Sequence, residues 1–357
     1  MMPDLIAAKK TVAVVDCMYL PFKPSDSCLG GSETWIVEIA KAFAGFGWHV
    51  VVFANTGNPV ITGSIEWFPF EHLRRRCEYQ VFDIAIFSRG FIFSNIIRAT
   101  RNYLMFHDLA LARAVDPVDR SNFNRIDRLY VLSDYAKDFI RTHVVSAPED
   151  RFFLTHNGID YNLYSRSVNK QPAMVWSSCR ERGFGFFVAQ VLPTILAAVP
   201  EFVLHVCSYN DYGPQAYIDI PAELKKHMVF HGKLGKQELA ALQCGTKVWC
   251  YPNLGYLDVA PDCEFGETFC ITAVENLAAG NIIIAGDFGG LQTTLQGYPL
   301  LGRDYYLNRR IPAEKLEDYG RYLADYCIAA LRDEYTPLHC IPPHKYTWEA
   351  AAMTFIN

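Results

Sequence analysis

The 357-residue sequence lacks the features that mark several common protein classes. Its 11 cysteines include no C-x-x-C pair, and their scattered spacing indicates neither a zinc site nor a disulfide framework. No stretch approaches the roughly 18 consecutive apolar residues that span a bilayer, and the N-terminal apolar runs are too short for a signal-peptide core. These absences predict a cytoplasmic protein with reduced thiols and at most peripheral contact with a membrane.

The sequence also lacks a large net charge and the common nucleotide-binding motifs. The net charge of −5 and the lack of long like-charge runs argue against a nucleic-acid partner. The absence of G-x-G-x-x-G argues against a dehydrogenase. No D-x-D motif suits a nucleotide-bound metal, since Asp258 and Asp262 are spaced wrongly, so no metal is expected. The run Arg74–Arg76 is more typical of a solvated helix face than of a membrane-binding patch.

What the sequence does contain is a regular alternation of apolar runs and amphipathic segments. Val12–Val15 is a short continuous apolar run, typical of a strand buried on both faces. Ser32 and Ser133 are the expected N-caps of two helices. This alternation predicts a parallel sheet with helices on both faces. Further strands are expected at His49–Ala54, Asp83–Phe87, Tyr103–Phe106, Leu129–Leu132 and Phe152–Leu154.

A polar stretch at 165–172 interrupts the alternation of apolar and amphipathic segments and indicates an interdomain linker. The alternation then restarts, so the chain is an α/β protein with two Rossmann-like, doubly wound domains, 1–165 and 166–340, and a terminal helix within 341–357. Strands are expected at Met174–Trp176, Phe202–Cys207, Met228–Phe230, Val248–Tyr251 and Ile282–Ala285. Helices are expected at Phe184–Ala198, Gln237–Gln243, Thr268–Ala279, Ala313–Leu331 and Tyr346–Phe355.

A glycine pair, Gly30 and Gly31, opens the first helix. Glycines there permit positive φ and let backbone N–H groups approach an anion, and a helix N-terminus adds about half a positive charge. The pattern suits a phosphate or diphosphate. An ordinary strand-to-helix turn would have the same sequence, so both interpretations stay open.

Two carboxylates carry the strongest pattern. Glu267 falls in a loop, and Glu275 follows in the next helix on a face shared with Thr268, Ile271 and Ala278. A carboxylate on an apolar face needs a partner, because unpaired burial costs a few kcal/mol. Sugar hydroxyls are suitable partners, since one carboxylate accepts two of them. The alternative is that Glu275 pairs with a basic neighbour.

The order of the motifs resembles that of retaining GT-B glycosyltransferases of glycosyltransferase family 4, over nearly the whole chain. The segment 267–280, ETFCITAVENLAAG, followed by 282–290, IIIAGDFGG, resembles their nucleotide-sugar signature. Further matches in the same order are Gly30–Glu33, Asp127–Ser133, His156–Asp160, Phe230–Gly232 and Tyr346–Glu349. The resemblance implies a GT-B fold, in which the two domains face each other across a cleft.

The resemblance also implies roles for the two carboxylates and their neighbours. Glu275 would hold the ribose hydroxyls of the donor nucleotide, and Glu267 would hold the donor sugar. Arg182 would neutralise the diphosphate, and His107 would lie beside the transferred sugar. Gly30 and Gly31 would approach the diphosphate, and Gly232 would end the strand beside the base.

Two departures from the family pattern stand out. An arginine usual in the family, a second diphosphate cation, is replaced by the segment Ser177-Ser178, whose hydroxyls donate hydrogen bonds but carry no charge. Substitution of that cation by Arg180 is the open alternative. Thr268 and Cys270 stand where glycines are more common, and both are small enough to be tolerated. Tyr209, Tyr251 and Tyr256 lie near strand ends, where they could stack on a sugar.

The expected activity is therefore transfer, with retention, of a sugar from a nucleoside diphosphate, UDP- or GDP-linked, to a hydroxyl of a glycan, a glycolipid or a protein glycan. No cofactor is expected. Two alternatives remain: a GT-B epimerase or hydrolase that acts without an acceptor, and a non-catalytic nucleotide-sugar-binding module, suggested by the missing arginine.

Overall fold

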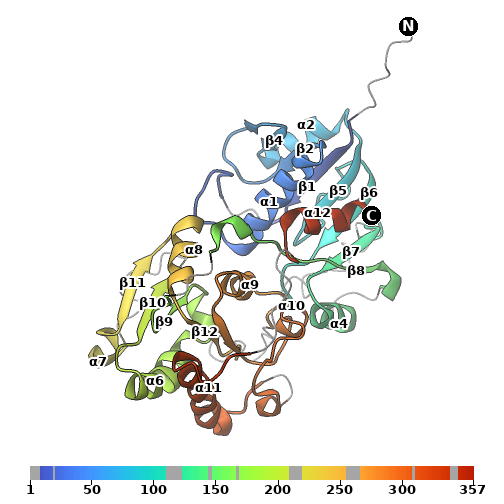
Figure 1. Cartoon of the computed structure of the whole chain (residues 1–357). Coiled ribbons are helices and arrows are strands. Elements are labelled where there is room, and N and C mark those ends of the chain that lie inside the picture. Colours follow the sequence, from blue (N-terminus) through green and yellow to red (C-terminus); the bar gives the residue numbers. More distant parts are fainter. Residues whose placement is uncertain are drawn as a thin grey trace. The chain divides into compact units, whose positions relative to one another are not determined.

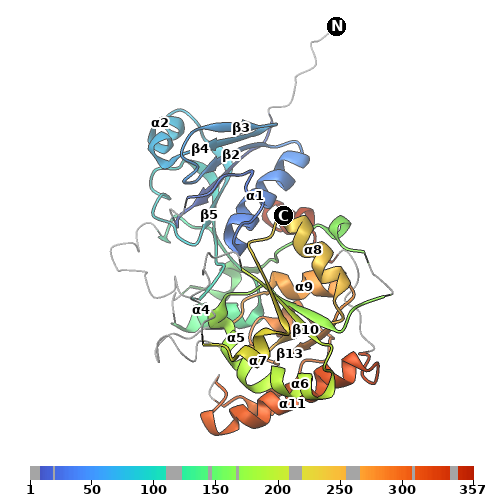
Figure 2. The same cartoon turned by 90° about the vertical axis from the view of Figure 1, so that its left-hand side faces the viewer.

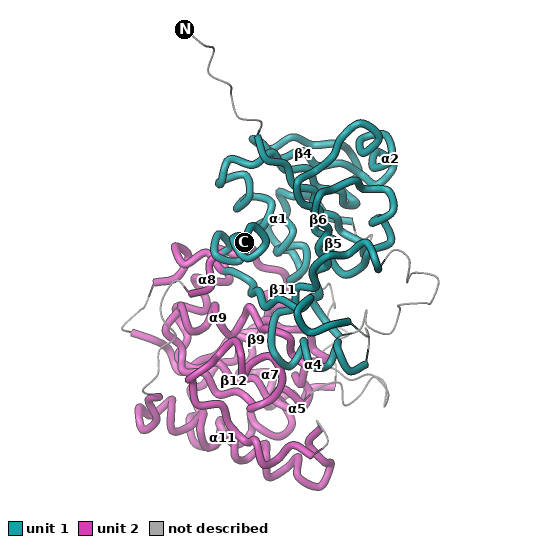
Figure 3. The backbone as a smooth tube through the Cα atoms, turned by 90° about the vertical axis from the view of Figure 1, so that its right-hand side faces the viewer, with its two compact units in different colours: residues 1–158, 348–357 teal, residues 159–347 magenta. Residues whose placement is uncertain are grey.

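A computed structural model describes residues 9–18, 21–109, 123–143, 147–165, 169–208, 219–254, 266–307, 310–337 and 345–357. The chain forms two compact units, shown in different colours in Figure 3. Unit 1 comprises residues 1–158 and 348–357, and unit 2 comprises residues 159–347. Within the described ranges, no helix is long and apolar enough to cross a membrane.

Unit 1 is built on an eight-stranded sheet in the order β3-β4-β2-β1-β5-β6-β7-β8. All neighbouring strands are parallel except β3 and β4. The strand order reverses between β1 and β5, which makes their carboxyl ends the switch point at which doubly wound sheets bind ligands. The strands are Thr11–Asp16 (β1), His49–Phe53 (β2), Val60–Thr62 (β3), Ile65–Phe68 (β4), Phe82–Ser88 (β5), Ala99–Met105 (β6), Arg128–Val131 (β7) and Phe152–Leu154 (β8).

Helices cover both faces of this sheet, as predicted. Helices α1 (Gly31–Gly45) and α12 (Trp348–Ile356) lie side by side (Figure 1), and the Trp35 ring of α1 meets the Phe355 ring of α12 edge to face. The Tyr130 hydroxyl donates to the Thr354 carbonyl at 2.9 Å and ties α12 to β7. The other face packs against α2 (Leu73–Cys77) and α4 (Asp134–His143).

The described residues of unit 2 form five parallel strands in two sheets, whereas the sequence predicts one sheet. Strands β11-β10-β9 form one sheet and β12-β13 another, and a parallel bridge between Gln171 and Thr246 joins them. The order β11-β10-β9-β12-β13 reverses between β9 and β12, as in a Rossmann fold. The strands are Ala173–Trp176 (β9), Val203–Cys207 (β10), Met228–Gly232 (β11), Val248–Tyr251 (β12) and Ile282–Ala285 (β13).

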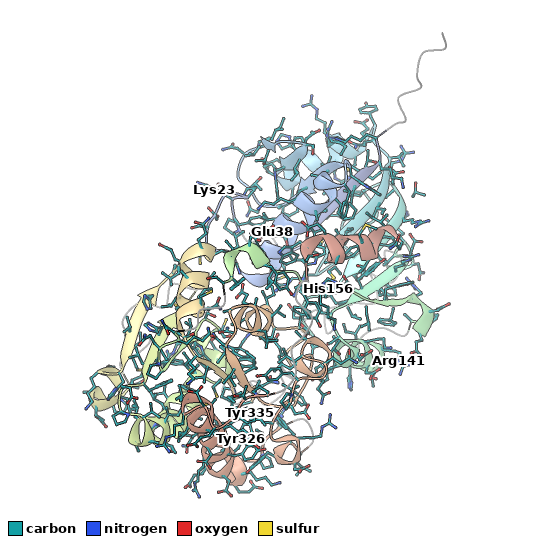
Figure 4. The ribbon with its side chains drawn as sticks, viewed as in Figure 1. Lys23, Glu38, Arg141, His156, Tyr326 and Tyr335 are labelled. Carbon is teal, nitrogen blue, oxygen red and sulfur yellow. The ribbon has the colours of Figure 1, made fainter. Side chains whose placement is uncertain are left out.

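Two helical layers sandwich these strands. Figure 2 shows α8 and α9 on one side and α6 and α11 on the other. Tyr326 and Tyr335 (Figure 4) pack edge to face near the C-terminal end of α11, with ring centroids 5.0 Å apart. The helices are Phe184–Phe186 (α5), Leu192–Ala198 (α6), Ala222–Lys225 (α7), Lys236–Gly245 (α8), Ile271–Ala278 (α9), Leu291–Thr294 (α10) and Leu316–Leu331 (α11). Short 3-10 turns occur at Phe70–His72, Glu149–Arg151, Tyr161–Leu163, Arg180–Arg182, Arg303–Tyr305 and Ala313–Lys315, and a π turn at Phe187–Val191 joins α5 to α6.

Several predicted helix ends differ from the structure. Gly30, not Ser32, caps α1, and the Ser32 hydroxyl, already inside the helix, donates to Glu33 at 3.0 Å. Ser133 is confirmed as a cap, because its hydroxyl accepts from the Ala136 N–H at 3.2 Å. Helix α9 begins at Ile271, three residues later than predicted from Thr268, because Cys270 adopts a left-handed conformation.

Candidate active site

Glu267 is the centre of a buried ionic contact in unit 2. Its carboxylate is 5% exposed, and Oε2 accepts from the Arg182 guanidinium at 2.9 Å and from the Tyr251 hydroxyl at 3.2 Å. Arg182 ends the 3-10 turn that follows β9, and Tyr251 ends β12, so both partners come from the strands at the switch point. Arg182 and Glu267 were both predicted as site residues. They are 85 positions apart in the sequence, and the structure brings them into contact.

A glycine pair shapes the loop that carries Glu267. A Cβ at Gly290 would lie 2.3 Å from the Thr268 carbonyl, and one at Gly289 would lie 2.9 Å from the Glu267 carbonyl oxygen. The Gly290 N–H donates to that Glu267 oxygen, and Gly289 has a φ of +67°. Because no side chain fits at Gly290, the two glycines hold the backbone of the Glu267 loop directly against α10.

Glu275 lies on α9 and is 3% exposed. Its Oε1 accepts from the Lys236 ammonium at 2.9 Å, and its Oε2 accepts from the Gln243 amide at 3.5 Å. The basic-neighbour alternative for Glu275 is therefore the arrangement seen here. Lys236 opens α8 and was missed, because a partner 39 residues away leaves no local signal in the sequence.

Cys270 joins the two carboxylate segments and is strained. It caps α9 with φ 69° and ψ 81°, a left-handed conformation that costs a residue with a side chain about 1–2 kcal/mol. Burial is the main cause that raises the pKa of its thiol well above the ordinary value, and Glu267 and Glu275 add to the rise. Cys270 was expected to be tolerated because its side chain is small. The left-handed backbone conformation, not side-chain size, is the physical reason why glycine would suit this position.

The other predicted residues of unit 2 have varied surroundings. Ser178 accepts at its carbonyl from the Trp176 indole at 3.0 Å, and Gly232 ends β11 with a φ of +67°. Stacking of Tyr251 on a sugar was wrong: its ring is 1% exposed and stacks on Trp249, with centroids 5.3 Å apart. Tyr209 and Tyr256 lie outside the described residues.

The predicted residues of unit 1 gather at the start of α1 and the end of β6. Gly30 has a φ of −66°, so it does not use the positive φ that glycine permits, and Gly31 is the first residue of α1. His107 is buried, with its ring edge to face with Trp35 at 4.9 Å. Burial, helped by Arg89, holds the pKa of His107 well below its ordinary value, so this imidazole is neutral.

Metal-ligating residues do not gather anywhere in the part of the chain that the structure describes. There, no three side chains of His, Cys, Asp or Glu lie close enough together to hold a metal ion. The acidic residues at the site, Glu267 and Glu275, are held instead by Arg182 and Lys236.

Comparison with known proteins agrees with this architecture. No family model matches the sequence. Phosphatidyl-myo-inositol mannosyltransferase from Mycobacterium tuberculosis is 25% identical over 166 residues, which cover 45% of this chain and 39% of that protein. The matched segment thus spans about two fifths of the length of that curated relative.

Solved structures match over almost the whole chain. Sucrose-phosphate synthase from Thermosynechococcus elongatus matches with a TM-score of 0.61 at 16% identity, covering 97% of each chain. Anabaena HepE in complex with UDP-glucose matches with a TM-score of 0.59 at 13% identity, covering 96% of this chain and 98% of that one. WaaG, a glycosyltransferase of lipopolysaccharide biosynthesis, matches with a TM-score of 0.58 at 14% identity, covering 90% and 94%. The chain therefore has the GT-B fold, and it resembles the GT-B glycosyltransferases and a family 4 mannosyltransferase.

Proposed function

We propose that the chain is a glycosyltransferase that moves a sugar from a nucleoside diphosphate to an acceptor hydroxyl, with retention at the anomeric carbon. The observation that carries the proposal is the pair of buried carboxylates in unit 2, Glu267 and Glu275, each held by a cation. The partners of Glu267 follow the strands at the switch point, β9 and β12. The UDP-glucose bound to HepE favours UDP as the carrier, and GDP is the alternative carrier that we propose to test.

Glu275 is the proposed ribose-binding residue. Its contact with Gln243 is long, at 3.5 Å, and is easier to exchange for a ribose hydroxyl than its contact with Lys236. Its contact with Lys236, at 2.9 Å, is a charge-assisted hydrogen bond that holds the buried carboxylate in place to accept that hydroxyl. Glu267, held by Arg182 and Tyr251, is the proposed residue for the sugar itself.

Arg182 is the proposed source of positive charge at the diphosphate. Its side chain is 30% exposed, and its guanidinium contacts Glu267 at 2.9 Å, the proposed residue for the sugar. The bond from the anomeric carbon to the diphosphate oxygen breaks, and the acceptor oxygen forms the new bond. Charge on the departing oxygens is stabilised by Arg182 and the hydroxyls of Ser177 and Ser178, and those oxygens take the acceptor proton. We propose that no metal ion is needed.

Ligand-induced stabilisation tests the donor site. Melting temperatures are measured with UDP, GDP and their sugars, because binding adds RT ln(1 + [L]/Kd) to the free energy of unfolding and so raises the melting temperature. The proposal expects one nucleoside diphosphate family to stabilise the protein and Arg182→Ala to abolish sugar transfer from it. Normal transfer by that variant would contradict the proposed role.

A non-catalytic binding module is the second candidate, favoured by the neutral Ser177 in place of a diphosphate cation. Product analysis with and without acceptor separates the candidates. A transferase gives a new glycoside only with acceptor, and an epimerase or hydrolase gives product without it. A binding module is stabilised by the nucleotide and gives no product in either case.

A further inference from the structure

Three buried polar atoms at the carboxyl edge of the unit 1 sheet have no hydrogen-bond partner among the described residues. They are Asp16 Oδ2, Ser88 Oγ and Trp35 Nε1. Buried polar atoms are nearly always hydrogen-bonded, and each one left unpaired costs about 1–3 kcal/mol. Three such atoms in one region indicate a group that the protein is built to receive.

Asp16 and Ser88 lie next to each other. They end the parallel strands β1 and β5 and are direct partners in the register of that pair. The strand order of unit 1 reverses between these two strands, and ligands of doubly wound sheets bind at this point. The location therefore agrees with a binding site rather than with an accident of core packing.

The third atom comes from the helix that covers the same face. Val15 and Phe87, the residues before Asp16 and Ser88, pack in the core on the α2 and α4 side. Because side chains alternate along a strand, Asp16 and Ser88 point to the opposite face, which α1 covers. Helix α1 carries Trp35, whose ring also contacts His107, so the three atoms belong to one side of the sheet.

Charge disfavours an anion next to Asp16. Burial raises the pKa of Asp16 to about 6, and Glu33 adds to the rise while the Met18 N–H and Arg89 oppose it. Arg89 is paired with Asp108 at 3.2 Å, and its buried Nε has no hydrogen-bond partner among the described residues. A phosphate at Asp16 Oδ2 would be repelled by the carboxylates of Asp16 and Glu33, whereas a neutral group avoids this repulsion.

A hydroxyl is the smallest neutral group that both donates and accepts a hydrogen bond. It donates to Asp16 Oδ2 and accepts from the Ser88 hydroxyl or the Trp35 indole N–H. We propose that Asp16, with Ser88 and Trp35, binds a hydroxyl of the sugar or polyol that accepts the transferred glycosyl group. This inference rests on the proposed function, because it names the acceptor-side residues of that reaction.

Asp16→Asn inverts the polarity of the site with little change in shape. Oδ1 of Asp16 accepts from the Met18 N–H at 3.1 Å, so the amide oxygen of Asn keeps that position. The amide NH2 then stands where Oδ2 was and cannot accept from a hydroxyl. Ser88→Ala is the second variant, and Asp83→Asn is the matched control, since Asp83 lies near the amino end of β5 and accepts from Thr11.

The probes are myo-inositol, methyl α-mannoside and methyl α-glucoside, and binding is measured by saturation-transfer NMR. The wild type and Asp83→Asn should bind at least one probe equally, and Asp16→Asn should weaken that binding at least tenfold. Ser88→Ala should weaken it less. If no probe binds the wild type, or if Asp16→Asn binds as well as the wild type, the three atoms hold only a structural water and the inference is wrong.

A separate measurement distinguishes this outcome from failure of the proposed function. Calorimetry with UDP and GDP is carried out on the wild type and on Asp16→Asn. Nucleotide binding by both, with unchanged polyol binding by the variant, overturns only the acceptor inference. If neither nucleotide binds the wild type, the proposed function fails, and the polyol comparison still decides the role of Asp16.

Discussion

Asp16→Asn should make unit 1 more stable at neutral and alkaline pH. Burial raises the pKa of Asp16 from 3.8 to about 6, so the folded protein binds this proton more tightly than the unfolded chain does. Stability from protonation is full below the unfolded pKa of 3.8 and is lost as the pH rises through about 6. Asparagine does not ionise and escapes this loss.

The magnitude follows from the shift. A change from 3.8 to about 6 corresponds to about 3 kcal/mol, at roughly 1.36 kcal/mol per pKa unit. The stability of Asp16→Asn relative to the wild type should therefore rise by up to about 3 kcal/mol between pH 4 and pH 8. Comparing the two proteins at each pH cancels the other groups that titrate over this range.

Urea unfolding with hydrogen exchange measures the effect on unit 1. Exchange of the β1 and β5 amides reports the local free energy of opening at pH 4, 6 and 8. A difference between the two proteins that does not change with pH would refute the reasoning, because the carboxyl would then be no harder to ionise in the folded state.

Three further predictions concern the carboxylate segments of unit 2. Lys236→Met removes the cation from buried Glu275 and should lower the free energy of unfolding, measured in urea, by about 1–3 kcal/mol. The loss should be smaller than for a fully buried pair, because the Lys236 side chain is 40% exposed. An unchanged urea midpoint would contradict a stabilising contact. Gly290→Ala should displace the Glu267 loop, which crystallography would show, and weaken donor binding while β12 and β13 stay intact; donor binding at wild-type strength would argue against this. Cys270→Val, with a β-branched residue at a φ of 69°, should destabilise the protein by about 2 kcal/mol or more, whereas Cys270→Gly should be tolerated; thermal unfolding decides, and equal effects would exclude backbone strain as the cause.

The core strands could be predicted from the sequence because each is a continuous apolar run. Val12–Val15 lies within β1, and every one of its residues is fully buried. Strand β3 gave no such signal, since all three of its residues are exposed. Helix α2 was considered only as an arginine-rich helix face, and its buried residues are only Leu73 and Cys77.

Site residues could be predicted from the sequence only where each lies in a recognisable motif. Glu267 and Glu275 were found because they flank a short segment at a fixed spacing. Lys236 was not found, because its contact with Glu275 depends on how α8 packs against α9. Asp16 was not singled out either, since a single Asp at a strand end is a weak signal until its partner in register is known.

The central claim, that Glu275 in unit 2 binds the nucleotide of a sugar donor, is tested most directly by calorimetry on Glu275→Gln. This variant keeps the shape of the side chain and removes only its charge. The account predicts that the wild type binds a UDP- or GDP-sugar and that Glu275→Gln binds the same donor at least tenfold more weakly. Equal affinity of the two proteins, or no binding of either donor by the wild type, would contradict it.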